Sequence, residues 1–124
     1  TADQIGDLAR RGHEVGNHTT SHLNLDTDNY AEVAYEVRQA SERLEMITGA
    51  TPHHFAVPYG TNPGFTEENC KRLRTEFGFE SICLCRGGVN RHDSDRSSVE
   101  RIPVSLENYA SPYGWLFDVC RDAL

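Results

Sequence analysis

The sequence predicts an α/β fold built mostly from parallel strands. Segments with helical periodicity alternate with short apolar segments of strand length. This alternation is typical of βαβ units, in which a helix connects two parallel strands. No repeat or linker divides the chain, so we expect residues 1–124 to form a single domain. The first predicted element is a helix, whereas such folds usually begin with a strand, so we expect this domain to be incomplete at its N-terminus.

Composition excludes several classes of partner. The chain carries 19 acidic and 12 basic residues, a formal net charge of -7, and its pI is about 5.3. Nucleic acids and anionic membranes bind basic surfaces, so we expect neither as a partner. No apolar run approaches the roughly 20 residues of a membrane-spanning helix. The four cysteines lack the C-x-x-C spacing of a zinc ribbon, and we expect buried free thiols.

The first predicted elements are a short helix and a short strand. Thr1 and Gln4 form a capping-box pattern, and Gly12 is placed to end the helix in the left-handed conformation. Residues 13–16 then have the pattern of a short strand. A strand this short between helices is expected to be central and parallel.

The longest helix is predicted over residues 30–47. Asp28 or Asn29 is placed to cap it, and Gly49 and Pro52 end it. Its apolar residues recur at helical spacing for five turns: Tyr30, Val33, Ala34, Val37, Ala40, Leu44 and Ile47. The remaining predicted elements are a strand over 53–57 ended by Pro58, a helix between Thr66 and Gly78, a strand over 79–85, a surface loop over 86–100, a strand over 101–105 and a helix after Ser111.

Two histidines, His18 and His22, follow the first predicted strand. Neutral imidazole is a common metal ligand, although a pair at this spacing is also consistent with two polar loop residues. Sites of α/β folds form at the carboxyl ends of their parallel strands. The loop that begins Pro58-Tyr59-Gly60 leaves the next strand, so both loops are expected to open on one face. The sequence therefore predicts the wall of an active site.

Both segments resemble motifs of one family. The stretch GHEVGNHTTSH over residues 12–22 resembles the metal-binding motif of the polysaccharide deacetylases, carbohydrate esterase family 4. In that family the two histidines of an H-[ST]-x-x-H element bind zinc or another divalent metal, which here implies His18 and His22. The stretch FAVPYG over 55–60 is similar to the family's R-x-P-[YF]-G element. The similarity runs from Thr1 to about Pro103 and implies a partial or distorted (β/α) barrel.

The resemblance implies a reaction. The enzyme would be a metal-dependent hydrolase that removes N-acetyl or O-acetyl groups from a polysaccharide or oligosaccharide by means of metal-activated water. Pro58, Tyr59 and Gly60 would line the substrate groove, and the backbone N–H of Tyr59 would stabilise the oxyanion. By the same resemblance the cofactor would be a divalent metal, with zinc the first candidate, and the protein would belong to the cell envelope or be secreted.

Several parts of the family pattern are missing. The T-F-D-D motif, which supplies the general base and the third metal ligand, is absent, so we expect that aspartate upstream of Thr1. Ala56 replaces the arginine of the second motif, and no general-acid element is recognisable. Catalytic zinc normally has three protein ligands. We therefore expect this chain alone to bind metal weakly and to turn over slowly or not at all. Other titratable residues are interpreted as loop, cap or strand positions: Asp26, Asp28, His53, His54 and His92.

Two alternatives stay open at this stage. One is a non-catalytic carbohydrate-binding or structural member of the same fold. The other is a hydrolase of C–N bonds in small amides. A sheet edge without a neighbouring strand also predicts self-association of the chain.

Overall fold

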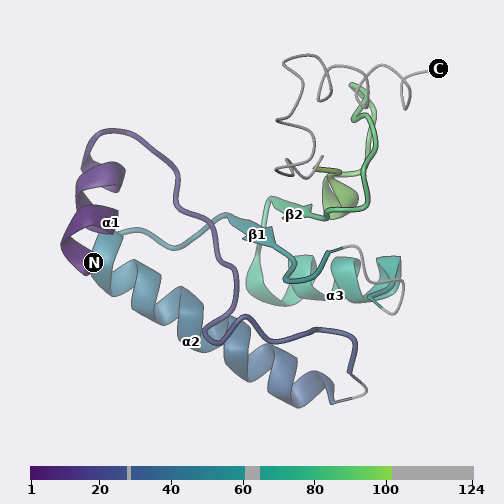
Figure 1. Ribbon diagram of the computed structural model, residues 1–124, viewed down its shortest axis with the longest axis horizontal. Coiled ribbons are helices and arrows are strands. Elements are labelled where there is room, and N and C mark those ends of the chain that lie inside the picture. Colours follow the sequence, from purple (N-terminus) through teal and green to yellow (C-terminus); the bar gives the residue numbers. More distant parts are fainter. Residues whose placement is uncertain (28, 61–64, 102–124) are drawn as a thin grey trace, which may run out of the picture.

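The computed structural model describes residues 1–27, 29–60 and 65–101, which form an α/β arrangement (Figure 1). Its elements, in chain order, are α1 (Ala2–Arg10), α2 (Tyr30–Thr48), β1 (His54–Ala56), α3 (Glu67–Phe77), β2 (Ser81–Cys83) and the 3-10 helix η1 (Arg96–Ser98). The predicted alternation of helices and strands is confirmed for α2, β1, α3 and β2, whereas α1 and α2 follow each other with no strand between them in the described residues. None of the helices in the described ranges is both long and apolar enough to cross a lipid bilayer.

Parallel pairing organises the strands. β1 and β2 are parallel, with Phe55 opposite Ile82. Asn17 forms a parallel bridge to Phe55 on one side of this pair, and Val99 forms a parallel bridge to Cys83 on the other. Four chain segments therefore lie side by side in the order of the sequence and point the same way. Their carboxyl ends meet at one edge, as the sequence predicts.

The bounds of the predicted strands are wrong. β1 and β2 are shorter than the predicted 53–57 and 79–85, and the bridges formed near the other two lie outside their predicted bounds. Residues 13–16 form no strand, because only the next residue, Asn17, pairs with β1: its N–H donates to the His54 carbonyl and its own carbonyl accepts from Ala56, both at 2.8 Å. The pairing predicted to start at Arg101 occurs earlier, at Val99, inside the segment predicted to be a loop. That loop also contains η1. Residues 102–105 and the predicted last helix lie outside the described residues.

Helix ends follow the local sequence signals. The capping box at Thr1 is formed, and the side chain of Thr66 caps α3 by accepting from the Asn69 N–H. Gly49 and Gly78 end α2 and α3 with φ angles of 76° and 70°, a conformation that L side chains rarely adopt. Asn29 occupies the N-cap position of α2 as predicted, without a capping hydrogen bond from its side chain.

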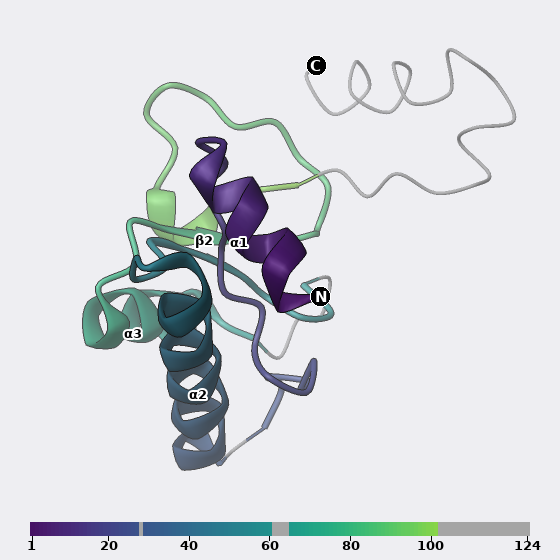
Figure 2. The same cartoon turned by 90° about the vertical axis from the view of Figure 1, so that its left-hand side faces the viewer.

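The core lies between the strands and the helices α2 and α3, which Figures 1 and 2 show on the same side of the strands. Phe55 and Phe79 stack at its centre with ring centroids 5.4 Å apart. The fully buried side chains of this core include Val37, Phe55, Val57, Leu73, Ile82 and Leu84. Cys70 is a buried free thiol, as predicted; Cys83 and Cys85 are also free but only half-buried, because they alternate with the buried Ile82 and Leu84 and so face away from this core.

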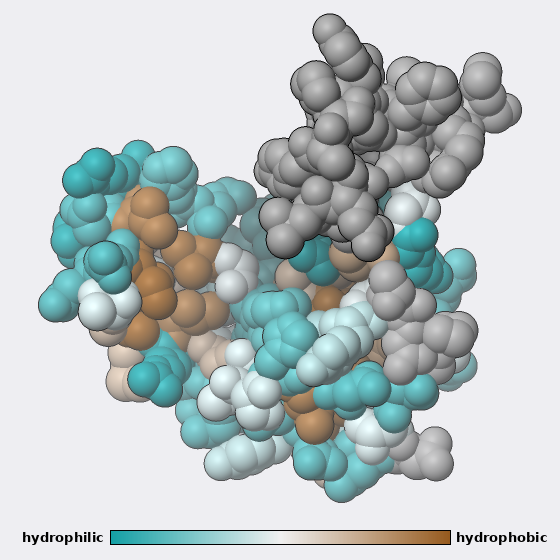
Figure 3. Space-filling model, viewed as in Figure 1, coloured by the Kyte–Doolittle hydropathy of each residue, from teal (hydrophilic) through white to brown (hydrophobic). Residues whose placement is uncertain are grey.

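α1 packs on the C-terminal half of α2 and leaves an apolar groove beside it (Figure 3). This groove has a volume of about 510 Å³ and lies between the two helices and residues 15–20. Its apolar lining comes from Ile5, Val15, Ala40, Leu44 and Ile47. Within the described ranges, no hydrogen bond joins the backbone of Gly16 or His18 to another residue. No described residue therefore pairs with the edge of the sheet on this side.

Candidate functional site

The two predicted histidines lie against each other. The ring centroids of His18 and His22 are 4.8 Å apart, with an angle of 75° between the ring planes. The Nδ1 atom of His18 lies 2.7 Å from the carbonyl oxygen of Ala56 in β1. A carbonyl only accepts, so Nδ1 carries the proton and the lone pair of the neutral ring resides on Nε2. His18 thus offers Nε2 as a ligand, held in place by the neighbouring strand.

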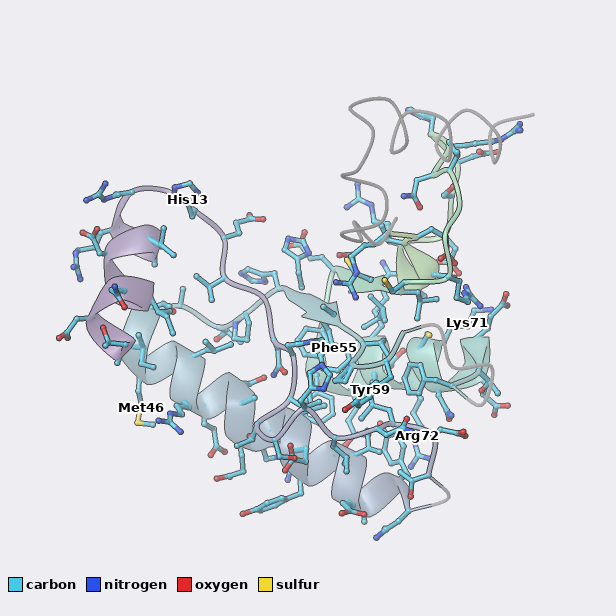
Figure 4. All side chains as sticks on the ribbon, in the orientation of Figure 1. His13, Met46, Phe55, Tyr59, Lys71 and Arg72 are labelled. Carbon is cyan, nitrogen blue, oxygen red and sulfur yellow. The ribbon has the colours of Figure 1, made fainter. Side chains whose placement is uncertain are left out.

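The Pro58-Tyr59-Gly60 loop approaches the same histidines. The ring of Tyr59 packs edge-on against His22, with centroids 4.6 Å apart. Tyr59 is 56% exposed, whereas Pro58 and Gly60 are buried. Figure 4 shows Tyr59 close to Phe55 near the centre of the molecule, and His13 far from both. Of the three residues predicted to line the groove, the structure therefore exposes the aromatic ring.

Three residues of these two loops have an unfavourable backbone conformation. Thr19, His22 and Tyr59 have φ angles of 63°, 60° and 51°, and they are the non-glycine residues with positive φ in the described part of the chain. Such residues cost about 1–3 kcal/mol each, persist only where surrounding contacts hold them, and concentrate at functional sites. The strain supports the interpretation of the two loops as one site.

Gly60 brings the second loop close to the end of β2. A Cβ atom at this position would lie 2.8 Å from the backbone nitrogen of Cys85, closer than real Cβ contacts come. The Cys85 N–H donates to the Gly60 carbonyl at 3.1 Å. This hydrogen bond holds the turn in which Tyr59 lies, directly before Gly60. None of the described residues accepts a hydrogen bond from the backbone N–H of Tyr59, so none of them competes with a ligand for that donor.

The buried side chain of Asn17 holds the start of the histidine loop, by which we mean residues 18–22. Its side chain is fully buried, and its amide nitrogen donates to the Val37 carbonyl and to the Ser41 hydroxyl, both at 2.8 Å. Its side-chain oxygen accepts from the N–H of Thr19 at 2.9 Å. The sequence showed Asn17 only as a flank of the histidine motif. The sequence did contain one signal that Asn17 holds the loop: it is a polar residue at a strand position where an apolar residue is expected.

The other histidines lie away from His18. His54 contacts Ser81 at 2.9 Å and Glu14 at 3.0 Å, and its neighbour His53 lies 3.8 Å from Glu80, all near the amino ends of the strands. His92 is exposed in a loop. Within residues 1–27, 29–60 and 65–101, no group of three His, Cys, Asp or Glu side chains is placed to hold a metal ion. The described residues thus bring together two imidazoles at the carboxyl edge.

Comparison with known proteins decides the family. The family model described as "Polysaccharide deacetylase" matches residues 1–80, which contain both loops. The chain belongs to the polysaccharide deacetylase family. Members of this family are generally metal-dependent and act on polysaccharides. The resemblance inferred from the two sequence motifs is confirmed.

Individual relatives of this polysaccharide deacetylase are distant or matched over short stretches. A chitin deacetylase from Arthroderma benhamiae is 23% identical over 98% of this chain and 32% of its own length. A chitooligosaccharide deacetylase from Azorhizobium caulinodans is 44% identical over 40% of this chain and 24% of its own. A peptidoglycan-N-acetylglucosamine deacetylase from Bacillus cereus is 38% identical over 43% and 19%, respectively. The chain thus spans a third or less of these relatives.

Solved structures share the fold. IcaB from Ammonifex degensii superposes with a TM-score of 0.67 at 23% identity, over 93% of this chain and 52% of its own. A polysaccharide deacetylase from Bacillus cereus gives a TM-score of 0.63 at 19% identity, over 89% and 35%, respectively. The described residues therefore adopt part of the α/β fold of the polysaccharide deacetylases.

Proposed function

We propose that the chain is part of a metal-dependent hydrolase that removes N-acetyl or O-acetyl groups from a polysaccharide. The observation that carries the proposal is the contact of His18 with His22 at the carboxyl edge, with the Tyr59 ring packed on His22. Family membership supports the reaction class. The names of the relatives, which include deacetylases of chitin and of peptidoglycan, support an N-acetylated glycan as the substrate.

Zinc fits the donor set of the two histidines. Both side chains are exposed, their rings are in contact, and the Ala56 carbonyl fixes the Nδ1–H tautomer of His18. Neutral imidazole nitrogen is a preferred zinc ligand. A bound divalent metal would lower the pKa of a water molecule and polarise the acetyl carbonyl. His18 and His22 would hold the ion, and the third ligand would be a carboxylate from outside the described residues.

The Tyr59 loop would bind the substrate. Its backbone N–H, which no described residue binds, would donate to the carbonyl oxygen of the acetyl group, on which negative charge develops in the transition state. Its exposed ring offers an apolar face to a sugar, while the buried Pro58 and Gly60 keep the loop in place. We propose that the general base is an aspartate upstream of Thr1. In this proposal, the complete fold is a (β/α) barrel, residues 1–124 are one incomplete domain of it, and the protein acts in the cell envelope or outside the cell.

A non-catalytic carbohydrate-binding role is the second candidate. It is favoured by Ala56, which stands where the resembled motif has an arginine, and by the two-imidazole ligand set of the described residues. Such a protein would still bind glycans through the exposed Tyr59 ring. It would release no acetate, with or without metal.

Acetate release tests the proposal. Acetate would be measured from N-acetylated chitooligosaccharides with added zinc, for the 124-residue chain and for the same chain extended to its full reading frame. We expect zinc-dependent release by the extended protein, lost in His18→Ala and His22→Ala, and slow or no release by the 124 residues alone. Glycan binding without acetate release would favour the non-catalytic role. Release of ammonia from small amides, in place of acetate, would instead indicate the C–N hydrolase of small amides.

A further inference from the structure

A carboxylate of α2 binds the middle of the histidine loop. The Oε2 atom of Glu36 accepts hydrogen bonds from the backbone N–H groups of Thr20 at 3.0 Å and of Ser21 at 2.8 Å. The hydroxyl of Thr20 donates to the backbone carbonyl of Glu36 at 3.2 Å. Hydrogen bonds from N–H groups to an ionised carboxylate are roughly twice as strong as those between neutral groups. Glu36 is half-buried, so water screens these bonds only in part.

The hydrogen bonds of Glu36 lie at the turn between the two histidines. Thr20 and Ser21 lie between the two histidines, and the residues on either side of them, Thr19 and His22, have positive φ. A backbone with two strained residues around one turn persists only where contacts over-determine it. Asn17 supplies such a contact before the turn, the Thr19 hydroxyl accepts from the Leu23 N–H across it, and Glu36 binds its two middle residues.

We propose that Glu36 is a positioning residue for the metal site, which holds the loop in the conformation that brings His18 and His22 together. The inference rests on the proposed function in so far as the two histidines bind a metal. Glu36 touches neither imidazole nor any reacting group; it acts through the backbone between them. Outer residues that orient ligands typically change metal affinity by about 10- to 100-fold when they are removed.

Three variants of Glu36 separate the effects of its acceptor oxygen, its charge and its length. Glu36→Ala removes the acceptor. Glu36→Asp keeps the charge but is shorter by one methylene, so it reaches the loop poorly. Glu36→Gln keeps an oxygen at the same distance, and one oxygen suffices because Oε2 accepts both bonds. The matched control is Glu42→Ala, which removes another carboxylate of α2 that contacts Gln39 and not the loop.

Two measurements are made on the folded 124-residue chain and its variants. The first is hydrogen exchange of the Thr20 and Ser21 amides by NMR without metal, and the second is the Kd for zinc by calorimetry. In Glu36→Ala and Glu36→Asp we expect exchange about tenfold faster and zinc binding about 10- to 100-fold weaker. Glu36→Gln keeps the acceptor oxygen but loses the charge, so both changes should be smaller than in Glu36→Ala, and Glu42→Ala should match the unaltered chain.

The inference is overturned if Thr20 and Ser21 exchange in Glu36→Ala and Glu36→Asp as they do in the unaltered chain. It is also overturned if both variants bind zinc as tightly as the unaltered chain does, since Glu36 would then be merely structural. Equal zinc binding by the unaltered chain and by His18→Ala has another meaning. It would contradict the proposed function, while the exchange rates would still decide whether Glu36 holds the loop.

Discussion

The Nδ1 atom of His18 lies 2.7 Å from the carbonyl oxygen of Ala56, and this contact ties the histidine loop to the neighbouring strand β1. It predicts that the neutral ring of His18 carries its proton on Nδ1. Nitrogen-15 chemical shifts of the imidazoles, recorded above pH 8, report this directly. The exposed His92 serves as the control and should show the usual preference for a proton on Nε2. A His18 ring protonated mainly on Nε2 would contradict the assignment of Nε2 as the ligand atom.

Gly60 is predicted to tolerate no side chain. In Gly60→Ala the Cβ atom would lie 2.8 Å from the Cys85 nitrogen, which is backbone and cannot rotate away. We expect destabilisation of about 1–3 kcal/mol, measured by denaturant unfolding. The comparison is Gly88→Ala, whose Cβ would meet a side chain, that of Glu100, at 3.2 Å rather than backbone, and which should therefore cost less stability than Gly60→Ala. Equal stability of the two variants would count against the tight turn at Gly60.

Cys70 gives a prediction for alkaline pH. Burial raises the pKa of its thiol from 9.0 to about 11, because the thiolate is poorly solvated in the core. The pKa of the Cys70 thiol is higher in the folded chain than in the unfolded chain. The contribution of the neutral thiol to folding stability is therefore complete below pH 9 and is lost as the pH rises through about 11. The loss amounts to about 3 kcal/mol. Denaturant unfolding at pH 8 and pH 11 should show a smaller drop for Cys70→Ala than for the unaltered chain; equal drops would refute the shift.

The sheet edge at Gly16 and His18 predicts self-association. Parallel pairing leaves the backbone of these two residues facing the groove beside α1, where no described residue pairs with it. Unpaired edges are templates for pairing with a second chain. Light scattering across a concentration series should show a dimer or larger species of the 124-residue chain. A monomer at all concentrations, with a cooperative thermal transition, would contradict this prediction.

Local sequence signals were sufficient for α1, α2 and α3 and for the order of β1 and β2. The five-turn periodicity of α2 and the glycines that end α2 and α3 depend only on residues near in the sequence. They therefore do not depend on how the rest of the chain folds. The bounds of strand pairing were not predictable in this way. Whether Asn17 or Val99 pairs depends on where a partner backbone lies, and that is set by residues distant in the sequence.

The candidate site shows the same division. The spacing of His18 and His22 and the Pro58-Tyr59-Gly60 segment marked the two loops, and the structure brings them into contact. The contacts that hold the two loops in place could not be predicted from the sequence. Glu36 is one of several acidic residues on α2, and nothing in its neighbours distinguishes it until the loop folds over it.

A zinc titration of the unaltered chain, His18→Ala, His22→Ala and the double variant tests the central claim most directly. The claim is that His18 and His22 share one metal ion. Two ligands of one site act as a unit, so either single variant should lose nearly as much affinity as the double variant. Equal zinc binding by the unaltered chain and by His18→Ala would contradict the claim and remove the metal site from this account.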